Sequence, residues 1–267
     1  MTYPKGYHTI TLGTVFKKGN IMFDSTSPWS KMAYFKQGDG FKCLILGHQK
    51  RLGENPIPAL HAATELGANP QAICILHTAS NGDDPGFQLI KRPNYQSPVE
   101  AEGVFLEDRY CAAIMQTADC PTIILTNNKT GKIVVTHAGR PALAPKDHCG
   151  DCTIVETALS QVGTRDFSKV SACVVGDICG KCFKHDHASA RSLVTPFLPL
   201  GERVFTDMES GALSLFAVIK HRLIHAGVPE MNIEHYGECT FEKRQYASHR
   251  RDNNRNDRNH IIVVKTR

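Results

Sequence analysis

Short apolar runs separated by polar turns cover most of the chain from Gln71 onward. Hydrophobic periodicity predicts strands over 71–77, 111–116, 121–126 and 132–137. The sequence NNKTG between the last two runs predicts a β-hairpin. Further strands are expected at 87–91 and in the segments GFKCLILG, VSACVVGDI, NIEHYGECT and HIIVVK.

Helical spacing of apolar residues appears in three segments. The clearest is SGALSLFAVIKHRLIHAGV, which Ala226 and Gly227 close. TIVETALSQV has Asp151 or Thr153 available as its N-cap, and PIPALHAATELGA is a weaker candidate. Because no linker or repeat is visible, we expect a single α/β domain over 1–267, with mixed β-sheets flanked by helices. The poorly patterned residues 1–60 would form a divergent N-terminal part of it.

Composition narrows the class of protein. The chain has 267 residues, of which 41% are hydrophobic and 21% charged, and a formal net charge of +5. This mild basic excess favours small anionic ligands over a dedicated nucleic-acid surface. Ten cysteines are too few for a disulfide scaffold of this length. With no signal-peptide core and no membrane-length apolar stretch, we expect a soluble cytoplasmic protein; its oligomeric state is open.

Three of the apolar runs end on side chains that bind metals. AICIL leads to His77, CAAIMQTAD to Cys120, and KIVVT to His137. Two imidazoles and one thiolate can hold a tetrahedral zinc ion and leave one position open, which is typical of a catalytic site. The alternative for each residue alone is ordinary burial in the core.

These residues also carry a family resemblance. QTADCPTIIL, VVTHAGR, ECTF and SHRRD, in this order, resemble the YfiH-type proteins, also called the laccase or polyphenol-oxidase domain family, over roughly residues 70–267. The resemblance implies a fold of the type shared with the cytotoxic necrotizing factor deamidase domain. It also implies zinc bound by the residues that correspond to His77, Cys120 and His137. The implied activity is phosphorolysis of adenosine, inosine or guanosine, with adenosine deamination in some members.

The chain departs from the family pattern at two flanks. It has HAGRPA where the family has HAGWRG, and ILHTAS where the family has Q-V-H-G. Metal binding should survive these changes better than substrate identity. Zinc is redox-inert, so it suits Lewis-acid chemistry and not oxidation. A multicopper oxidase would also need several His-x-His pairs, and the sequence offers only His185 and His187.

Phosphorolysis needs fixed donors for phosphate, and arginine forks supply them. Arg250 is a candidate catalytic residue, and the candidates for substrate binding are Arg140, Arg251 and the hydroxyl of Ser248. The alternative is a solvated arginine-rich face. Asp119 could orient a ligand histidine or cap a loop.

A second group of cysteines forms two C-x-x-C pairs. They are Cys149 with Cys152, and Cys179 with Cys182. This spacing is typical of a structural zinc site, while a disulfide or unrelated thiols remain open. Cys239 is expected to pack near the pocket.

Two other readings of the same residues stay open. Cys120 as nucleophile and His137 as base would make a metal-free hydrolase or deamidase, because a thiolate can serve as nucleophile or ligand. A domain that keeps zinc for stability and binds RNA or protein through residues 243–258 would have no activity. The leading hypothesis is a zinc-dependent enzyme, transferase or hydrolase, whose partners are a purine nucleoside and phosphate.

Overall fold

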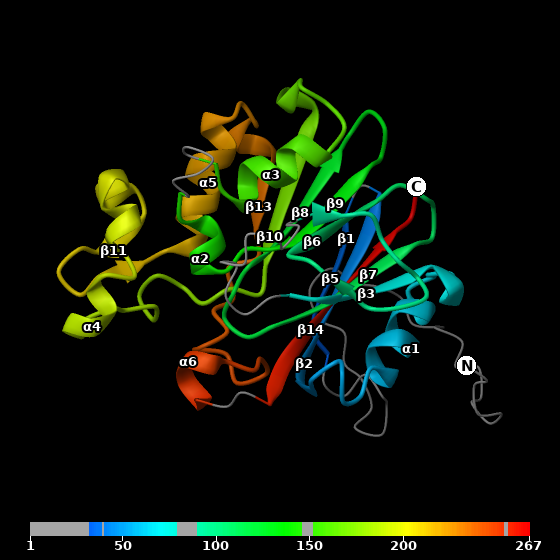
Figure 1. Cartoon of the computed structure of the whole chain (residues 1–267), viewed down its shortest axis with the longest axis horizontal. Coiled ribbons are helices and arrows are strands. Elements are labelled where there is room, and N and C mark those ends of the chain that lie inside the picture. Colours follow the sequence, from blue (N-terminus) through cyan, green and yellow to red (C-terminus); the bar gives the residue numbers. More distant parts are fainter. Residues whose placement is uncertain (1–31, 39, 79–89, 146–151, 254–255) are drawn as a thin grey trace. The chain divides into compact units, whose positions relative to one another are not determined.

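The computed structural model describes residues 32–38, 40–78, 90–145, 152–253 and 256–267. Within them, strands form two six-stranded sheets and a two-stranded sheet (Figure 1). The first sheet has the order β1 (Met32–Gly38), β2 (Phe41–Lys50), β14 (Asp257–Lys265), β7 (Ala112–Thr117), β3 (Ile73–His77) and β5 (Val99–Glu100). The second has the order β13 (Ile233–His235), β10 (Val170–Val175), β8 (Thr122–Asn127), β9 (Ile133–His137), β6 (Gly103–Leu106) and β4 (Ile90–Lys91).

Both sheets are mixed, as the sequence predicts. In the first, β3 runs parallel to β5 and β7, while β14 is antiparallel to β7 and β2. In the second, β8 and β9 form the predicted hairpin, with Thr126 opposite Ile133. The Asn127 carboxamide accepts the backbone N–H groups of Lys129 and Thr130 and so builds the turn.

Apolar side chains from the two sheets form one shared core. Ile45, Met115 and Val263 of the first sheet belong to the same buried cluster as Ile124 and Val135 of the second. Strands buried on both faces have continuous apolar runs in place of strict alternation. This explains why the runs at 111–116, 121–126 and 132–137 were readable from the sequence.

Helices cover the other face of the second sheet. Leu125 of β8 and Val134 of β9 share a second buried cluster with Leu159 of α3 (Ile154–Gln161) and Val218 of α5 (Leu215–His225). The predicted cap of α3 is confirmed: the Thr153 hydroxyl accepts from a backbone N–H, and Glu156 completes a capping box. The remaining helices are short: α2 (Arg140–Leu143), α4 (Ala188–Arg191) and α6 (His249–Asp252). The two-stranded sheet pairs β11 (Phe205–Asp207) with β12 (Ala212–Leu213).

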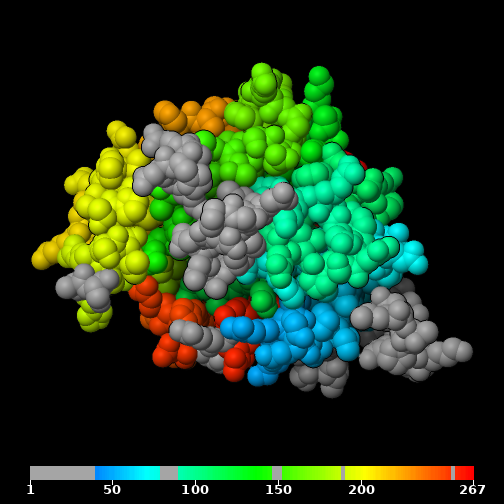
Figure 2. Space-filling model, viewed as in Figure 1, coloured from blue at the N-terminus to red at the C-terminus, as the bar shows by residue number. Residues whose placement is uncertain are grey.

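The described part of residues 1–60 is built into the first sheet. β2 pairs with β14 along its length, and in Figure 2 the blue beginning of the described chain lies beside its red end. The helix α1 (Ile57–Glu65) packs against β14 and β7. The described residues belong to one unit that runs from Lys31 to Arg267. That the whole of 1–267 forms one domain stays a prediction. No helix within the described ranges combines the length and hydrophobicity that a membrane crossing requires.

Candidate active site

Two of the three predicted metal ligands lie next to each other. Cys120 lies in the short connection between β7 and β8, just after Asp119, whose φ of 78° turns the chain. His137 ends β9 and pairs with Thr122 of β8. Ala138 N–H donates to the carbonyl of Pro121 over 2.9 Å, which holds the ends of the hairpin strands together. The β8–β9 hairpin therefore brings the thiol and the imidazole to one edge of the second sheet.

Gly139 lies against both of these side chains. A Cβ at this position would lie 3.3 Å from His137 Nε2, 3.0 Å from its Cε1 and 3.5 Å from Cys120 Sγ. A larger residue at this position would therefore crowd both donor atoms. The thiol and the imidazole hydrogen-bond to each other, and together they offer a sulfur and a ring nitrogen, the donor types that zinc prefers.

Glu102, which the sequence analysis missed, holds the other side of the imidazole. Its Oε2 lies 2.5 Å from His137 Nδ1, and its side chain is only 1% exposed. Gly103 makes this approach possible, because a Cβ there would lie 2.5 Å from the Val135 carbonyl oxygen. Burial would lower the pKa of His137, but hydrogen bonds to Cys120 and Glu102 outweigh burial and raise that pKa to about 10. A single Glu before an apolar strand carries no signal that could have revealed it.

His77 ends β3 in the first sheet, as predicted. Its backbone carbonyl accepts from Ala101 N–H, one residue before Glu102. Among the described residues, however, the three-residue donor group whose atoms all lie within 4.8 Å of one another does not contain His77. Cys120 and His137 are thus assembled, while the role of His77 as the third zinc ligand stays a prediction.

Arg140 and Arg250 lie beside the Cys120–His137 site. Arg140 is the first residue of α2 and donates to His185 Nε2 over 3.2 Å. Arg250, in α6, lies over the ring of Phe183 at 4.7 Å and donates to the carbonyl of Lys184 over 2.6 Å. Burial lowers the pKa of Arg140; the charge of Cys120 raises it, and that of Arg250 lowers it.

Neither guanidinium forms an ion pair with a carboxylate in the part of the chain that is described. Two arginines that repel each other, neither paired with a carboxylate among the described residues, favour an anion from solution. Arg258, which the sequence analysis also missed, lies close enough to Cys120 for the two charges to interact.

Arg251 and Ser248 hold the protein's own backbone, and their role in substrate binding stays a prediction. The Arg251 guanidinium donates to the carbonyls of four loop residues and pairs with Asp252; the four are Thr240, Phe241, Lys243 and Tyr246. The Ser248 hydroxyl is the N-cap of α6 and is buried. The Arg251 guanidinium donates to several backbone carbonyls and the Ser248 hydroxyl accepts from the Arg251 N–H, so both residues help to position Arg250.

Asp119 also serves this loop and does not orient a histidine. Its carboxylate accepts from the Thr240 hydroxyl and from the backbone N–H of Arg250, each over 2.7 Å. The residue that precedes Cys120 in sequence therefore fixes the start of α6. This contact ties the position of Arg250 to that of the thiol.

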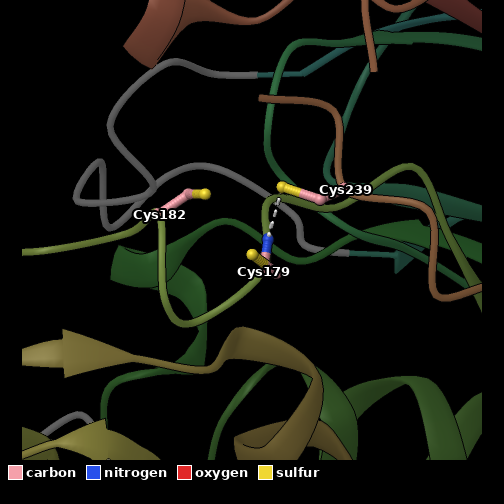
Figure 3. A group of neighbouring side chains, drawn as sticks. All are labelled: Cys179, Cys182 and Cys239. Carbon is pink, nitrogen blue, oxygen red and sulfur yellow. Dashed lines mark hydrogen bonds between the residues drawn. The ribbon is translucent and has the colours of Figure 1, made fainter. Parts of the chain in front are cut away.

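The second cysteine group differs from the predicted one. Cys179, Cys182 and Cys239 form the set whose Sγ atoms all lie within 4.8 Å of one another, close enough to hold a metal ion (Figure 3). Cys239 therefore belongs with the second C-x-x-C pair. Cys152 is exposed and not part of the set, and Cys149 lies outside the described residues. The Cys149–Cys152–Cys179–Cys182 set stays a prediction, and the described residues show Cys239 as a third partner of Cys179 and Cys182.

The family model described as multi-copper polyphenol oxidoreductase laccase matches residues 62–265. The chain belongs to this laccase family. Two relatives are named purine nucleoside phosphorylase. The one from Streptomyces coelicolor is 26% identical over 192 residues, 72% of this chain and 74% of the relative. The one from Streptomyces griseus is 26% identical over 238 residues, 88% and 90% of the two chains.

Solved structures of the laccase family share the fold. A Neisseria meningitidis protein matches with a TM-score of 0.68 and 15% identity, over 89% of this chain and all of its own. The YfiH protein of Bacillus licheniformis matches with a TM-score of 0.62 and 17% identity, over 91% and 99% of the two chains.

Within the described ranges, the donor group that could hold a metal consists of three cysteines, which is not the set of several histidines that a multicopper oxidase needs. Both ring nitrogens of His185, from the sequence's only His-x-His pair, are engaged: Nδ1 with the Gly211 carbonyl and Nε2 with Arg140.

Proposed function

We propose that this protein is a zinc-dependent enzyme that cleaves purine nucleosides with phosphate. The observation that carries the proposal is a soft donor pair, Cys120 and His137, which hydrogen-bond to each other and lie within reach of the charge of Arg140. The names of the two Streptomyces relatives support the substrate class. Base preference and any hydrolytic or deaminating activity are left to experiment.

The donor set fits zinc in chemistry and in space. Cys120 and His137 would hold the ion with His77 as the third ligand. Glu102 would orient His137 through Nδ1, the arrangement found around many zinc-bound histidines. When bound, zinc would supply Lewis-acid polarisation of an oxygen atom.

The arginines would hold phosphate against the ribose. Arg140 and Arg250 present planar N–H forks that match phosphate oxygens. A phosphate oxygen forms a bond to ribose C1′ while the C1′–N bond breaks with its electron pair moving to the purine. The proton of the hydrogen phosphate ion ends on the purine. The products are ribose 1-phosphate and free base, so atoms and charge balance.

The direct test measures free base released from adenosine, inosine and guanosine by zinc-loaded protein, with and without phosphate. We expect release that depends on phosphate and disappears in Cys120→Ala. Cys152→Ser, at an exposed cysteine outside both donor groups, is the matched control and should retain activity. Absence of base release from all three nucleosides would contradict the proposal.

One contact favours a second candidate, a metal-free Cys/His hydrolase or deamidase. Cys120, His137 and Glu102 are linked in the order nucleophile, base and orienting carboxylate, and the pKa of His137 is raised to about 10 after burial is offset. The Cys120 thiolate would attack an amide carbon, and ammonia would leave with a proton from His137. Water would then release the acyl group as an acid. Activity that persists under strict chelation and is lost on alkylation of Cys120 would select this candidate over the first.

A further inference from the structure

Three cysteines from two loops converge away from the Cys120–His137 pair. Cys179 and Cys182 lie on the loop that follows β10 (176–187), and Cys239 lies on the loop that follows β13 (236–248). Their three sulfur atoms lie within 4.8 Å of one another. Figure 3 shows the three side chains meeting from two separate stretches of backbone. Such convergence across 60 residues of sequence is not a consequence of the C-x-x-C spacing.

A carboxylate lies beside two of the three sulfur atoms. Glu242 Oε1 lies 3.6 Å from Cys182 Sγ and 3.9 Å from Cys179 Sγ. The backbone N–H of Cys179 donates to Cys239 Sγ over 3.2 Å, a contact that favours a thiolate there. The cluster therefore offers three sulfur atoms, one of which already accepts a hydrogen bond, and a carboxylate beside two of them could supply the fourth donor.

We propose that Cys179, Cys182, Cys239 and Glu242 bind a structural zinc ion. Four protein donors with three thiolates fill the tetrahedral shell that a closed zinc site uses, so no position remains for substrate. Burial raises the pKa of Cys182 and of Cys239, and neighbouring thiols add to the effect. The ion would therefore displace protons as it binds, and its affinity would increase with pH.

The zinc ion would join two loops that both contact the arginines. The loop 176–187 also carries Phe183, Lys184 and His185, which touch Arg250 and Arg140. The loop 236–248 leads directly into α6, where Arg250 lies. A metal at their meeting point would fix both sides of the proposed phosphate site. This consequence rests on the proposed function, whereas the metal site itself does not.

The test distinguishes the two metal sites by the number of cysteine ligands, which is one at the Cys120–His137 site and three at the cysteine cluster. In Cys120→Ala protein we expect one bound zinc by elemental analysis. After exchange for Co²⁺, this protein should show the strong thiolate-to-cobalt absorption of a three-sulfur site. The double variant with Cys120→Ala and Cys182→Ser should bind no zinc. Cys152→Ser in the same Cys120→Ala background is the matched control and should retain both the zinc and the absorption.

Glu242→Gln guards against a folding artefact, because Glu242 is exposed on its loop. With an unchanged circular dichroism spectrum, its zinc affinity in a chelator competition should fall at least about tenfold. Three outcomes would overturn the proposal: equal zinc content with and without Cys182, loss of zinc in Cys152→Ser, or a disulfide among the three cysteines with no metal uptake after reduction. None of these outcomes depends on enzymatic turnover. The structural zinc site can therefore be tested even if the protein does not cleave nucleosides.

Discussion

The Cys120–His137 pair and the three-cysteine cluster hold similar donor atoms in different ways. The pair lies at the ends of strands β7, β8 and β9, and a carboxylate at the start of β6 locks its imidazole. The cluster lies on two loops, outside the shared core of the sheets. A site on strands is placed by the same hydrogen-bond register that builds the fold, whereas a site on loops needs its own cross-link. We therefore expect chemistry at the first and structural support at the second.

The largest expected effect tests this division directly. Cys120→Ala and His137→Ala should each lower kcat/KM for nucleoside phosphorolysis by at least about 10³-fold, because they remove groups at the reacting centre. Cys182→Ser should lower it by no more than about tenfold, through looser placement of Arg250. Steady-state assays at saturating zinc compare the three variants. Equal losses of kcat/KM in Cys120→Ala and Cys182→Ser would show that the pair and the three-cysteine cluster do not have different roles.

A histidine on β14 tests how firmly the strands hold buried groups. His260 is fully buried and its Nε2 contacts the Lys50 carbonyl. Burial lowers its pKa to about 4, and the contact with Lys50 opposes this only in part. Between about pH 6.5 and 4, His260 is protonated in the unfolded chain but stays neutral in the folded protein. The free energy of unfolding is therefore highest above this pH range and decreases as the pH falls through it. The loss should reach about 3 kcal/mol.

Urea unfolding at several pH values measures that loss. His260→Gln keeps a side-chain donor but does not titrate, so its stability should fall less steeply over the same window. The other histidines contribute equally to both proteins, and the difference isolates His260. Identical slopes for the two proteins would show that this part of the sheet admits the charged form.

The strands and the Cys120–His137 pair could be predicted because apolar periodicity and the residues that end each run are local signals. β3, β7, β8 and β9 are found where the pattern places them, and Cys120 and His137 meet as expected. Glu102 could not be predicted, since its contact with His137 depends on the β6–β9 register and on the close approach at Gly103. No spacing along the chain encodes that register.

The loops show the opposite limit. Cys179 and Cys182 are recognisable as a pair, but the third partner is 57 positions beyond Cys182, and its loop is positioned by contacts such as that of Asp119 with Thr240. A motif search favours the nearer Cys149–Cys152 pair for this reason. Likewise, the motif HRRD contains two adjacent arginines with different contacts. Arg250 lies beside Lys184, whereas Arg251 donates to loop carbonyls such as that of Thr240.

The carboxylate behind His137 sharpens the comparison at intermediate size. Glu102→Gln keeps the shape but loses the charge that orients the ring, so zinc affinity at the Cys120–His137 site should fall by about 10- to 100-fold. Chelator competition in a Cys182→Ser background reports this site alone. Glu100→Gln, at an exposed position two residues away, is the matched control. If Glu102→Gln binds zinc as tightly as the wild-type protein, then Glu102 has no role in holding the metal.

The smallest expected effect separates two neighbouring arginines. Arg250→Lys should raise the KM for phosphate by about five- to tenfold, because an ammonium group cannot form the two-pronged contact, while the free energy of unfolding stays nearly unchanged. Arg251→Lys should show the reverse pattern. Its guanidinium serves several backbone carbonyls at once, and a lysine leaves some of them unpaired at a cost of about 1–3 kcal/mol. Phosphate titrations and denaturant unfolding on both variants give the two readouts. If both variants change only the KM for phosphate, then Arg251 also contacts substrate. Arg251 would then belong to the site and not to the loop that supports it.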